Sequence, residues 1–288
     1  MSAPKLLTSP LPSIEYRDGG ADVTFAEIGR SWSGVHGGVL VGALVDAAAA
    51  HSGLLPATVS AHLHAVAMPG TAAITTSTVV ARRSLASVDA VLEQDGVRRA
   101  SASVVLTVPP DGSPGHWPVP RDLPALPAPE QLDRLEGMEA VVPIARHFDI
   151  RAVEGLPLAG GAEPLLMAWI RLLPAPTYRE AVAVVLLDAL APSLYAVRTA
   201  PIPIPTVEFT VHFTPARPES EWFLLRQETT WATAAFCVDE AELCTPGGRV
   251  VARSRQLRRI LPPRTLCRDL HTGPHQGSEG GECADLGG

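Results

Sequence analysis

The feature that most constrains this chain is an internal repeat, because its two halves run through the same order of predicted elements. In the first half, HGG at residues 36–38 opens the apolar segment VLVGALVDAAAA. In the second half, YRE at residues 178–180 opens AVAVVLLDALAPS, and aligning Asp46 with Asp188 superposes the two segments. Their alanine, leucine and valine content predicts one buried helix in each half.

Each predicted helix is followed by a short proline-containing turn and then by strands. The first strand of each half begins with Thr-Val, at residues 58–64 and 206–212, and three further strand candidates follow it. Each half ends in a hairpin whose turn contains glycine, at Gly96 and Gly248. A helix that is apolar on every side must be covered, and a curved antiparallel sheet covers it. The sequence therefore predicts an α+β fold of two tandem modules, each an antiparallel curved sheet wrapped around a long central helix.

Two segments of unusual composition mark the boundaries of these modules. Residues 109–129 are crowded with proline, which removes backbone donors and fixes φ, so neither a helix nor a central strand persists there. The end of the chain is a glycine-rich polar stretch with almost nothing to bury. We therefore expect an N-terminal module, a semi-rigid proline-rich linker, a C-terminal module and a disordered tail, over residues 1–108, 109–137, 138–261 and 262–288.

Charge and hydropathy exclude several classes of partner. The 288-residue chain has a formal net charge of -7, which gives no overall field to attract nucleic acid or an anionic membrane. No apolar run reaches the roughly 18 to 20 residues of a membrane-spanning helix, and the start does not read as a signal peptide. The cysteines form no C-x-x-C pair and have no histidine at a zinc-ligand spacing, so we expect no metal site, free thiols and a cytoplasmic location. They are Cys237, Cys244, Cys267 and Cys283.

Asp188 is the first candidate for chemistry, because nearly every neighbour from 181 to 191 is apolar. An unpaired carboxylate in such a place costs several kcal/mol or becomes protonated, so Asp188 needs partners. A structural interpretation is that it binds backbone groups where the helix ends before Pro192. A functional interpretation is that it belongs to a catalytic site, because desolvated carboxylates mark such sites.

The second half is the more polar of the two at the equivalent positions. Aligning Gly96 with Gly248 places Val104 opposite Gln256. The first half then offers Asp46, Thr58 and Val104 where the second offers Asp188, Thr206 and Gln256.

The helix starts show the reverse asymmetry, because HGG leaves backbone N–H groups unobstructed whereas Arg179-Glu180 does not. Free N–H groups at a helix start stabilise an oxyanion. If the halves pack as a pseudo-twofold pair, the helix start of one faces the carboxylate of the other, and one complete site results.

Four features follow one another along residues 25–260: the HGG helix start, the helical Asp, the Thr-Val strand and the terminal S-x-Q strand. In this combination the chain resembles the type II acyl-CoA thioesterases, which are double hot-dog proteins. DALAP, PTVEFTVHF, EWFL and GGRVVARSRQ in the second half carry this resemblance most specifically. It implies hydrolysis of acyl-CoA to fatty acid and CoA without cofactor or metal, by a water that Asp188, Thr206 and Gln256 hold and activate. It also implies that the amide of Gly38, or of its neighbour Gly37, receives the carbonyl oxygen, while His36 assists or only shapes the turn.

Two alternatives remain open at this stage. A hot-dog acyl thioester hydratase or dehydratase needs a His-Asp pair, which His36 and Asp188 could supply, but the threonine and glutamine would then be unexplained. A non-catalytic acyl-CoA-binding module would act through a partner. In either case the sheet edges favour self-association, so we also expect a homo-oligomer.

Overall fold

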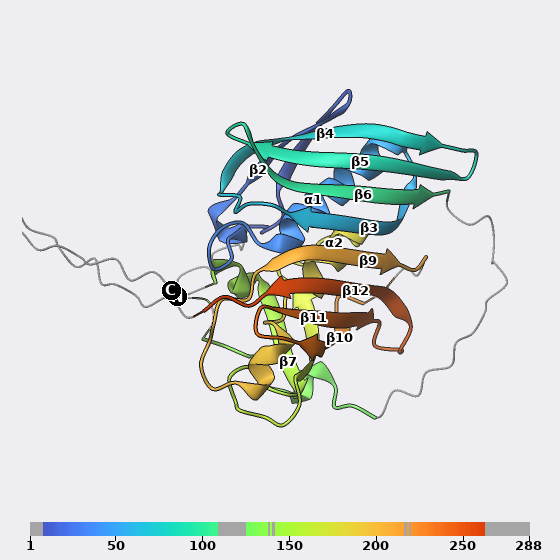
Figure 1. Ribbon diagram of the computed structural model, residues 1–288. Helices are drawn as coiled ribbons and strands as arrows, with labels where there is room; N and C mark the ends of the chain where they lie inside the picture. Colours follow the sequence, from blue (N-terminus) through green and yellow to red (C-terminus); the bar gives the residue numbers. More distant parts are fainter. Residues whose placement is uncertain are drawn as a thin grey trace, which may run out of the picture.

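The computed structural model describes residues 8–108, 125–137, 139, 142–215, 218 and 220–262. Residues 109–124 of the predicted linker and 263–288 of the predicted tail, with Cys267 and Cys283, lie outside this part of the chain. Within it, twelve strands form one antiparallel sheet in the order β1-β2-β4-β5-β6-β3-β9-β12-β11-β10-β8-β7. The first half of the sequence supplies one side of this sheet and the second half supplies the other (Figure 1).

The first half is built around one long helix. Helix α1 is buried along most of its length and packs against strands β2 to β6, because it is apolar on every side. It ends at Gly53, whose left-handed φ of 70° lets its N–H bond to the Ala49 carbonyl. The elements are β1 (Ser13–Arg17), β2 (Gly20–Phe25), η1 (Glu27–Gly29), α1 (Gly37–Ser52), β3 (Leu55–Leu63), β4 (Gly70–Ala81), β5 (Leu85–Gln94) and β6 (Val97–Thr107).

In the second half the helix is short. Helix α2 has eight residues and Asp188 is its C-cap, so the prediction of a long central helix is wrong for this half. Pro192 supplies no N–H and disfavours a helical Ala191, which leaves the segment after Leu187 without a continuing helix. The elements are η2 (Pro129–Gln131), η3 (Pro143–His147), β7 (Phe148–Glu154), β8 (Leu165–Leu172), α2 (Glu180–Leu187), η4 (Ser193–Val197), β9 (Thr206–Phe213), β10 (Phe223–Ala232), β11 (Phe236–Cys244) and β12 (Val250–Arg259).

The halves meet at two places. Strand β3 pairs with β9, where Ala61 lies opposite Phe209 and both are fully buried. The two helices lie on the same face of the sheet and contact each other (Figure 1). A Cβ atom at Gly42 would lie 3.1 Å from the Ala181 carbonyl oxygen, so the missing side chain allows this close approach. The sheet and the helix pair are therefore both continuous across the repeat.

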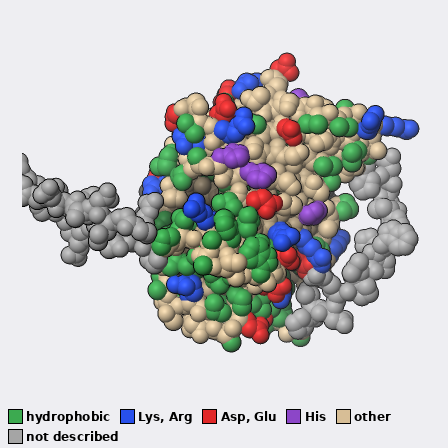
Figure 2. Space-filling model, in the orientation of Figure 1, with side chains coloured by type: hydrophobic (Ala, Val, Ile, Leu, Met, Phe, Trp, Pro, Cys, Tyr) green, Lys and Arg blue, Asp and Glu red, His purple; other side chains and the backbone are tan. Residues whose placement is uncertain are grey.

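The opposite face of the sheet carries polar side chains. Figure 2 shows histidine, acidic and basic side chains on it, and the stacked rings of His62 and His64 from β3 have centroids 6.2 Å apart. Among the helices of the described residues, none combines the length and the apolar character of a membrane-spanning segment. The same part of the chain contains no cluster of three potential metal ligands, and its two cysteines, Cys237 and Cys244, are buried thiols that form no disulfide with each other.

Candidate active site

The end of α2 brings Asp188 against the start of α1. The Gly38 N–H donates a hydrogen bond of 2.7 Å to Asp188 Oδ2. A Cβ atom at Gly37 would lie 3.0 Å from the same oxygen, so the two glycines give the carboxylate its room. His36 Nε2 donates to the Asp188 carbonyl at 2.9 Å and lies 3.5 Å from Oδ2. The Asp188 side chain is 9% exposed, so these contacts replace most of its solvent.

The two amides at the start of α1 differ in what they bind. The Gly38 N–H, which the sequence suggests as an oxyanion donor, is already taken by the Asp188 carboxylate. The neighbouring Gly37 N–H has no hydrogen-bond partner among the described residues. A helix start leaves such N–H groups unsatisfied and attracts negative charge. Of these two amides, the Gly37 N–H is therefore the one left to receive a ligand.

Thr206 and Gln256 lie side by side on β9 and β12. Thr206 Oγ1 donates to Gln256 Oε1 at 2.7 Å, and it accepts a hydrogen bond of 2.9 Å from Arg258 Nη1. Gln256 is 1% exposed, and its buried Nε2 has no hydrogen-bond partner within the part of the chain that the structure describes. Arg258 Nη2 lies 3.7 Å from Asp188 Oδ1. Arg258 thus connects the Thr206–Gln256 pair to the carboxylate at the helix start.

Sequence reasoning missed Arg258 and its partner Asp239. The Arg258 Nε atom lies 2.7 Å from Asp239 Oδ2, as an ion pair whose N–H is not aligned for a hydrogen bond. Asp239 also accepts hydrogen bonds from the Thr229 hydroxyl, at 2.6 Å, and from the Ser193 N–H, at 3.3 Å. The signal that could have found them is a charged residue on a strand where the other half is apolar.

Strand pairing corrects one part of the alignment between the halves. Thr206 lies opposite Arg258, and the equivalent pair in the first half is Pro56 opposite Leu106. The alignment of Thr206 with Thr58 is therefore wrong by two residues. Both ladders skip one residue at equivalent places, Ala57 in β3 and Val207 in β9, so the shared Thr-Val sequence is a coincidence and not a structural equivalence.

Asp46, the first-half counterpart of Asp188, is held in an ion pair. Arg179, the N-cap residue of α2, donates from Nε to the two carboxylate oxygens of Asp46 at 2.8 and 3.1 Å. Desolvation by burial raises the pKa of Asp46, although the Arg179 guanidinium acts in the opposite direction. Each carboxylate thus faces the start of the other half's helix, where Asp46 meets an arginine and Asp188 meets a bare amide.

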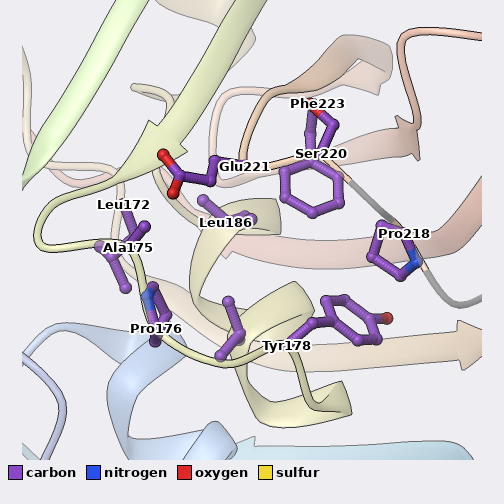
Figure 3. A pocket seen from close by; sticks show the side chains of 10 residues that line it. Leu172, Ala175, Pro176, Tyr178, Leu186, Pro218, Ser220, Glu221 and Phe223 are labelled. Carbon is purple, nitrogen blue, oxygen red and sulfur yellow. The ribbon is translucent and has the colours of Figure 1, made fainter.

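A cavity of about 180 Å³ lies beside α2, away from these polar residues. Figure 3 shows Tyr178, Leu186 and Phe223 around it. Its lining includes none of Asp188, Thr206, Gln256 or Arg258, so the cavity and the polar cluster are separate features.

Comparison with solved structures places the fold. A conserved protein with a hot dog fold from Alicyclobacillus acidocaldarius has a TM-score of 0.79 and 21% identity, covering 87% of this chain and 96% of that one. A putative thioesterase II from Thermobifida fusca has a TM-score of 0.76 and 22% identity, covering 88% and 96%. An acyl-CoA thioesterase II, TesB2, from Mycobacterium marinum has a TM-score of 0.67 and 16% identity, covering 88% and 97%. The chain therefore has the hot-dog fold.

Models of known protein families match most of the sequence. The acyl-CoA thioesterase N-terminal domain matches residues 28–107, and the acyl-CoA thioesterase C-terminal domain matches residues 120–260. No curated protein sequence matches the chain. The two family matches define the class of protein, a thioester-hydrolysing enzyme, and the solved structures show its hot-dog fold. The chain belongs to the acyl-CoA thioesterase family.

Proposed function

We propose that this enzyme hydrolyses acyl-CoA to a free fatty acid and CoA, using a water that Asp188, Thr206 and Gln256 hold and activate. The observation that carries the proposal is the position of the Asp188 carboxylate at the start of α1, joined through Arg258 to the Thr206–Gln256 pair. A carboxylate that is almost buried between helix ends serves as a general base when water replaces one of its contacts.

In this mechanism the base, the water-orienting amide and the oxyanion donor are three separate groups. The water oxygen bonds to the thioester carbonyl carbon while Asp188 takes a proton from that water. The unpartnered Nε2 of Gln256 orients the water for this attack. The Gly37 N–H receives the developing oxyanion, a contribution of roughly 3 to 4 kcal/mol for donors of this kind. The carbon–sulfur bond then breaks, and the proton on Asp188 passes to the leaving sulfur. A thiolate leaves readily, so no strong general acid is needed.

His36 has a positioning task in this mechanism. Its Nε2 is bound to the Asp188 carbonyl at 2.9 Å, which fixes the residue that follows α2. A hydratase or dehydratase would instead use His36 and Asp188 as its catalytic pair. That alternative leaves the partly buried Thr206–Gln256 hydrogen bond without a function, so hydrolysis accounts for more of the site.

The repeat itself supplies a test variant. Gln256→Val introduces the residue that the first half carries at the equivalent position, Val104. We expect wild type to release thiol from a panel of acyl-CoA esters, and the variant to lose kcat by about 10²-fold because an orienting donor is gone. Unchanged release by Gln256→Val would contradict the proposed role of the glutamine. No release by wild type from any ester would contradict thioester hydrolysis itself.

The remaining proposals concern organisation. We propose a double hot-dog of two modules, residues 1–108 and 138–261, joined by the segment 109–137. The separate ranges of the two family models support this division. Self-association and a cytoplasmic location stay predictions from the sequence, and size-exclusion chromatography with light scattering tests the first.

A further inference from the structure

The buried ion pair of Arg258 and Asp239 has no part in the mechanism described so far. Arg258 is 5% exposed and Asp239 is 1% exposed. Asp239 lies opposite Gln256 in the β11–β12 ladder, and Arg258 follows Gln256 by two residues on the same strand. Removing two charges from water is costly, and the attraction between them often fails to repay that cost. A buried pair in this position therefore needs a reason other than stability.

The first half of the chain shows that the fold does not require these charges. Val88 lies opposite Val104 in the β5–β6 ladder, as Asp239 lies opposite Gln256, and Leu106 follows Val104 as Arg258 follows Gln256. Val88 and Leu106 are fully buried. The same strand geometry is thus filled by a valine and a leucine in one half and by an ion pair in the other.

The chemistry of arginine shows what the pair does for the site. A guanidinium can only donate hydrogen bonds, so the Thr206 hydroxyl must accept from Arg258 Nη1. Its single hydrogen then goes to Gln256 Oε1. Because Oε1 is held in this way, the amide cannot turn over, and Gln256 Nε2 is the end left unpartnered. Arg258 therefore fixes which group donates and which accepts along this chain of hydrogen bonds, and so its direction.

Without Arg258 this direction is lost. The Thr206 hydroxyl could rotate, and the Gln256 amide could present its oxygen in place of its nitrogen, because each group both donates and accepts. An oxygen at that place accepts a proton from water and no longer holds the water oxygen. Asp239 in turn holds Arg258 from the far side, through Nε.

Recognition of a carboxylate on the substrate is a weaker explanation for Arg258. Its guanidinium already lies between Asp239, at 2.7 Å from Nε, and Asp188, at 3.7 Å from Nη2. Two carboxylates more than balance its charge. A third carboxylate would be repelled there.

We propose that Arg258, anchored by Asp239, is a positioning residue that fixes the hydrogen-bond direction of the Thr206–Gln256 pair and so presents Gln256 Nε2 to the attacking water. This inference rests on the proposed hydrolysis. It adds two residues to the site, and it explains why the second half carries charges where the first half carries aliphatic side chains.

The test exchanges the pair for the residues of the first half. We expect the Asp239→Val and Arg258→Leu double variant to keep the thermal unfolding midpoint of wild type or to exceed it, because apolar replacement of a buried ion pair is commonly tolerated. With acyl-CoA as substrate and released thiol as readout, kcat should fall about 10-fold to 100-fold, as expected for a misplaced reacting group, while KM changes little. A purely structural pair would leave kcat unchanged in a folded double variant, and that result would overturn the inference.

A second variant keeps the test decisive if the double variant does not fold. Arg258→Lys retains the charge, but an ammonium lacks the planar fork that reaches Thr206 and Asp239 together. We expect a kcat between those of wild type and a Gln256→Val variant, with KM preserved. Wild-type kcat in folded Arg258→Lys would refute the inference and leave the proposed function intact. Absence of turnover in wild type would remove both.

Discussion

Two aspartates that follow the same apolar pattern are treated differently by their surroundings. Asp188 accepts a hydrogen bond from the Gly38 N–H and lies 3.7 Å from Arg258 Nη2, whereas Asp46 accepts hydrogen bonds directly from Arg179. The difference arises at the helix starts, where glycines admit a carboxylate in one half and Arg179 pairs with it in the other. The residue at each helix start, Gly38 or Arg179, thus decides whether the carboxylate facing it is held by an amide or by an ion pair.

Asp46 gives a prediction for the pH dependence of stability. Desolvation raises its pKa in the folded protein, so the folded state holds this proton more tightly than the unfolded state. The carboxylate therefore costs stability once the pH exceeds the ordinary aspartate range, and the cost is absent below that range. We expect Asp46→Asn to gain free energy of unfolding relative to wild type between about pH 3 and pH 7. Urea denaturation at both pH values measures the difference, and a relative loss over this interval would contradict the assignment.

The sequence could predict Asp188 as a candidate because its neighbours are apolar, and Thr206 and Gln256 because the alignment of the two halves sets them beside it as the more polar set. It could not predict that Asp239 and Arg258 act together. The alignment of Gly96 with Gly248 places Leu106 opposite Arg258, but only the pairing of strands shows that Arg258 and Asp239 form one buried ion pair beside Gln256.

At the scale of elements, the contact between α1 and α2 depends on glycine. A Cβ atom at Gly38 would lie 2.9 Å from Asp188 Cβ and 3.0 Å from both the Val184 carbonyl oxygen and Val185 Cα. At Gly42 the nearest atom would be the Ala181 carbonyl oxygen, at 3.1 Å. The helices therefore approach most closely where the site is built.

This crowding sets an order for two substitutions. Alanine favours a helix over glycine by about 1 kcal/mol, but overpacking costs about 1 to 3 kcal/mol. We expect Gly38→Ala to lower the free energy of unfolding, and Gly42→Ala to lower it less or leave it near wild type. Guanidinium denaturation of the two variants provides the comparison. A Gly38→Ala variant more stable than Gly42→Ala would show that the helices are not held at this distance.

The sequence predicted both helices but only one of their lengths. Continuous apolar residues run from 181 to 187, and the same composition resumes at Ala189, so composition alone extends α2 too far. The end of α2 depends on Pro192 and on the attachment of Asp188 to another helix, and that attachment is a tertiary contact.

At the scale of the whole molecule, the two halves share one sheet and one helix pair. Phe209 is fully buried in β9 at the junction and pairs with Ala61 of β3 on one side and with Gln256 of β12 on the other. The repeat predicted two modules, but nothing in either half indicates which edges join. That information lies in the β3–β9 pairing.

The junction gives a prediction for cooperativity. Phe209→Ala should lower the free energy of unfolding by about 3 to 5 kcal/mol, the usual cost of deleting a buried aromatic ring. Because the sheet is continuous, hydrogen exchange in α1 and in α2 should accelerate to a similar degree. The control is Phe236→Ala on β11, where the ring is 37% exposed and the loss should be small. Faster exchange in α2 alone would indicate that the halves unfold independently.

The most direct test of the account compares the two aspartates in one assay of acyl-CoA hydrolysis. Asp188→Asn can still accept the Gly38 N–H but cannot take a proton, so we predict a loss of kcat of about 10²-fold to 10⁴-fold with affinity for a non-hydrolysable acyl-CoA analogue largely kept. Asp46→Asn, at the ion-paired counterpart, should keep the kcat of wild type. Unchanged turnover in Asp188→Asn, or an equal loss in both variants, would contradict the claim that one half supplies the base and the other the helix start.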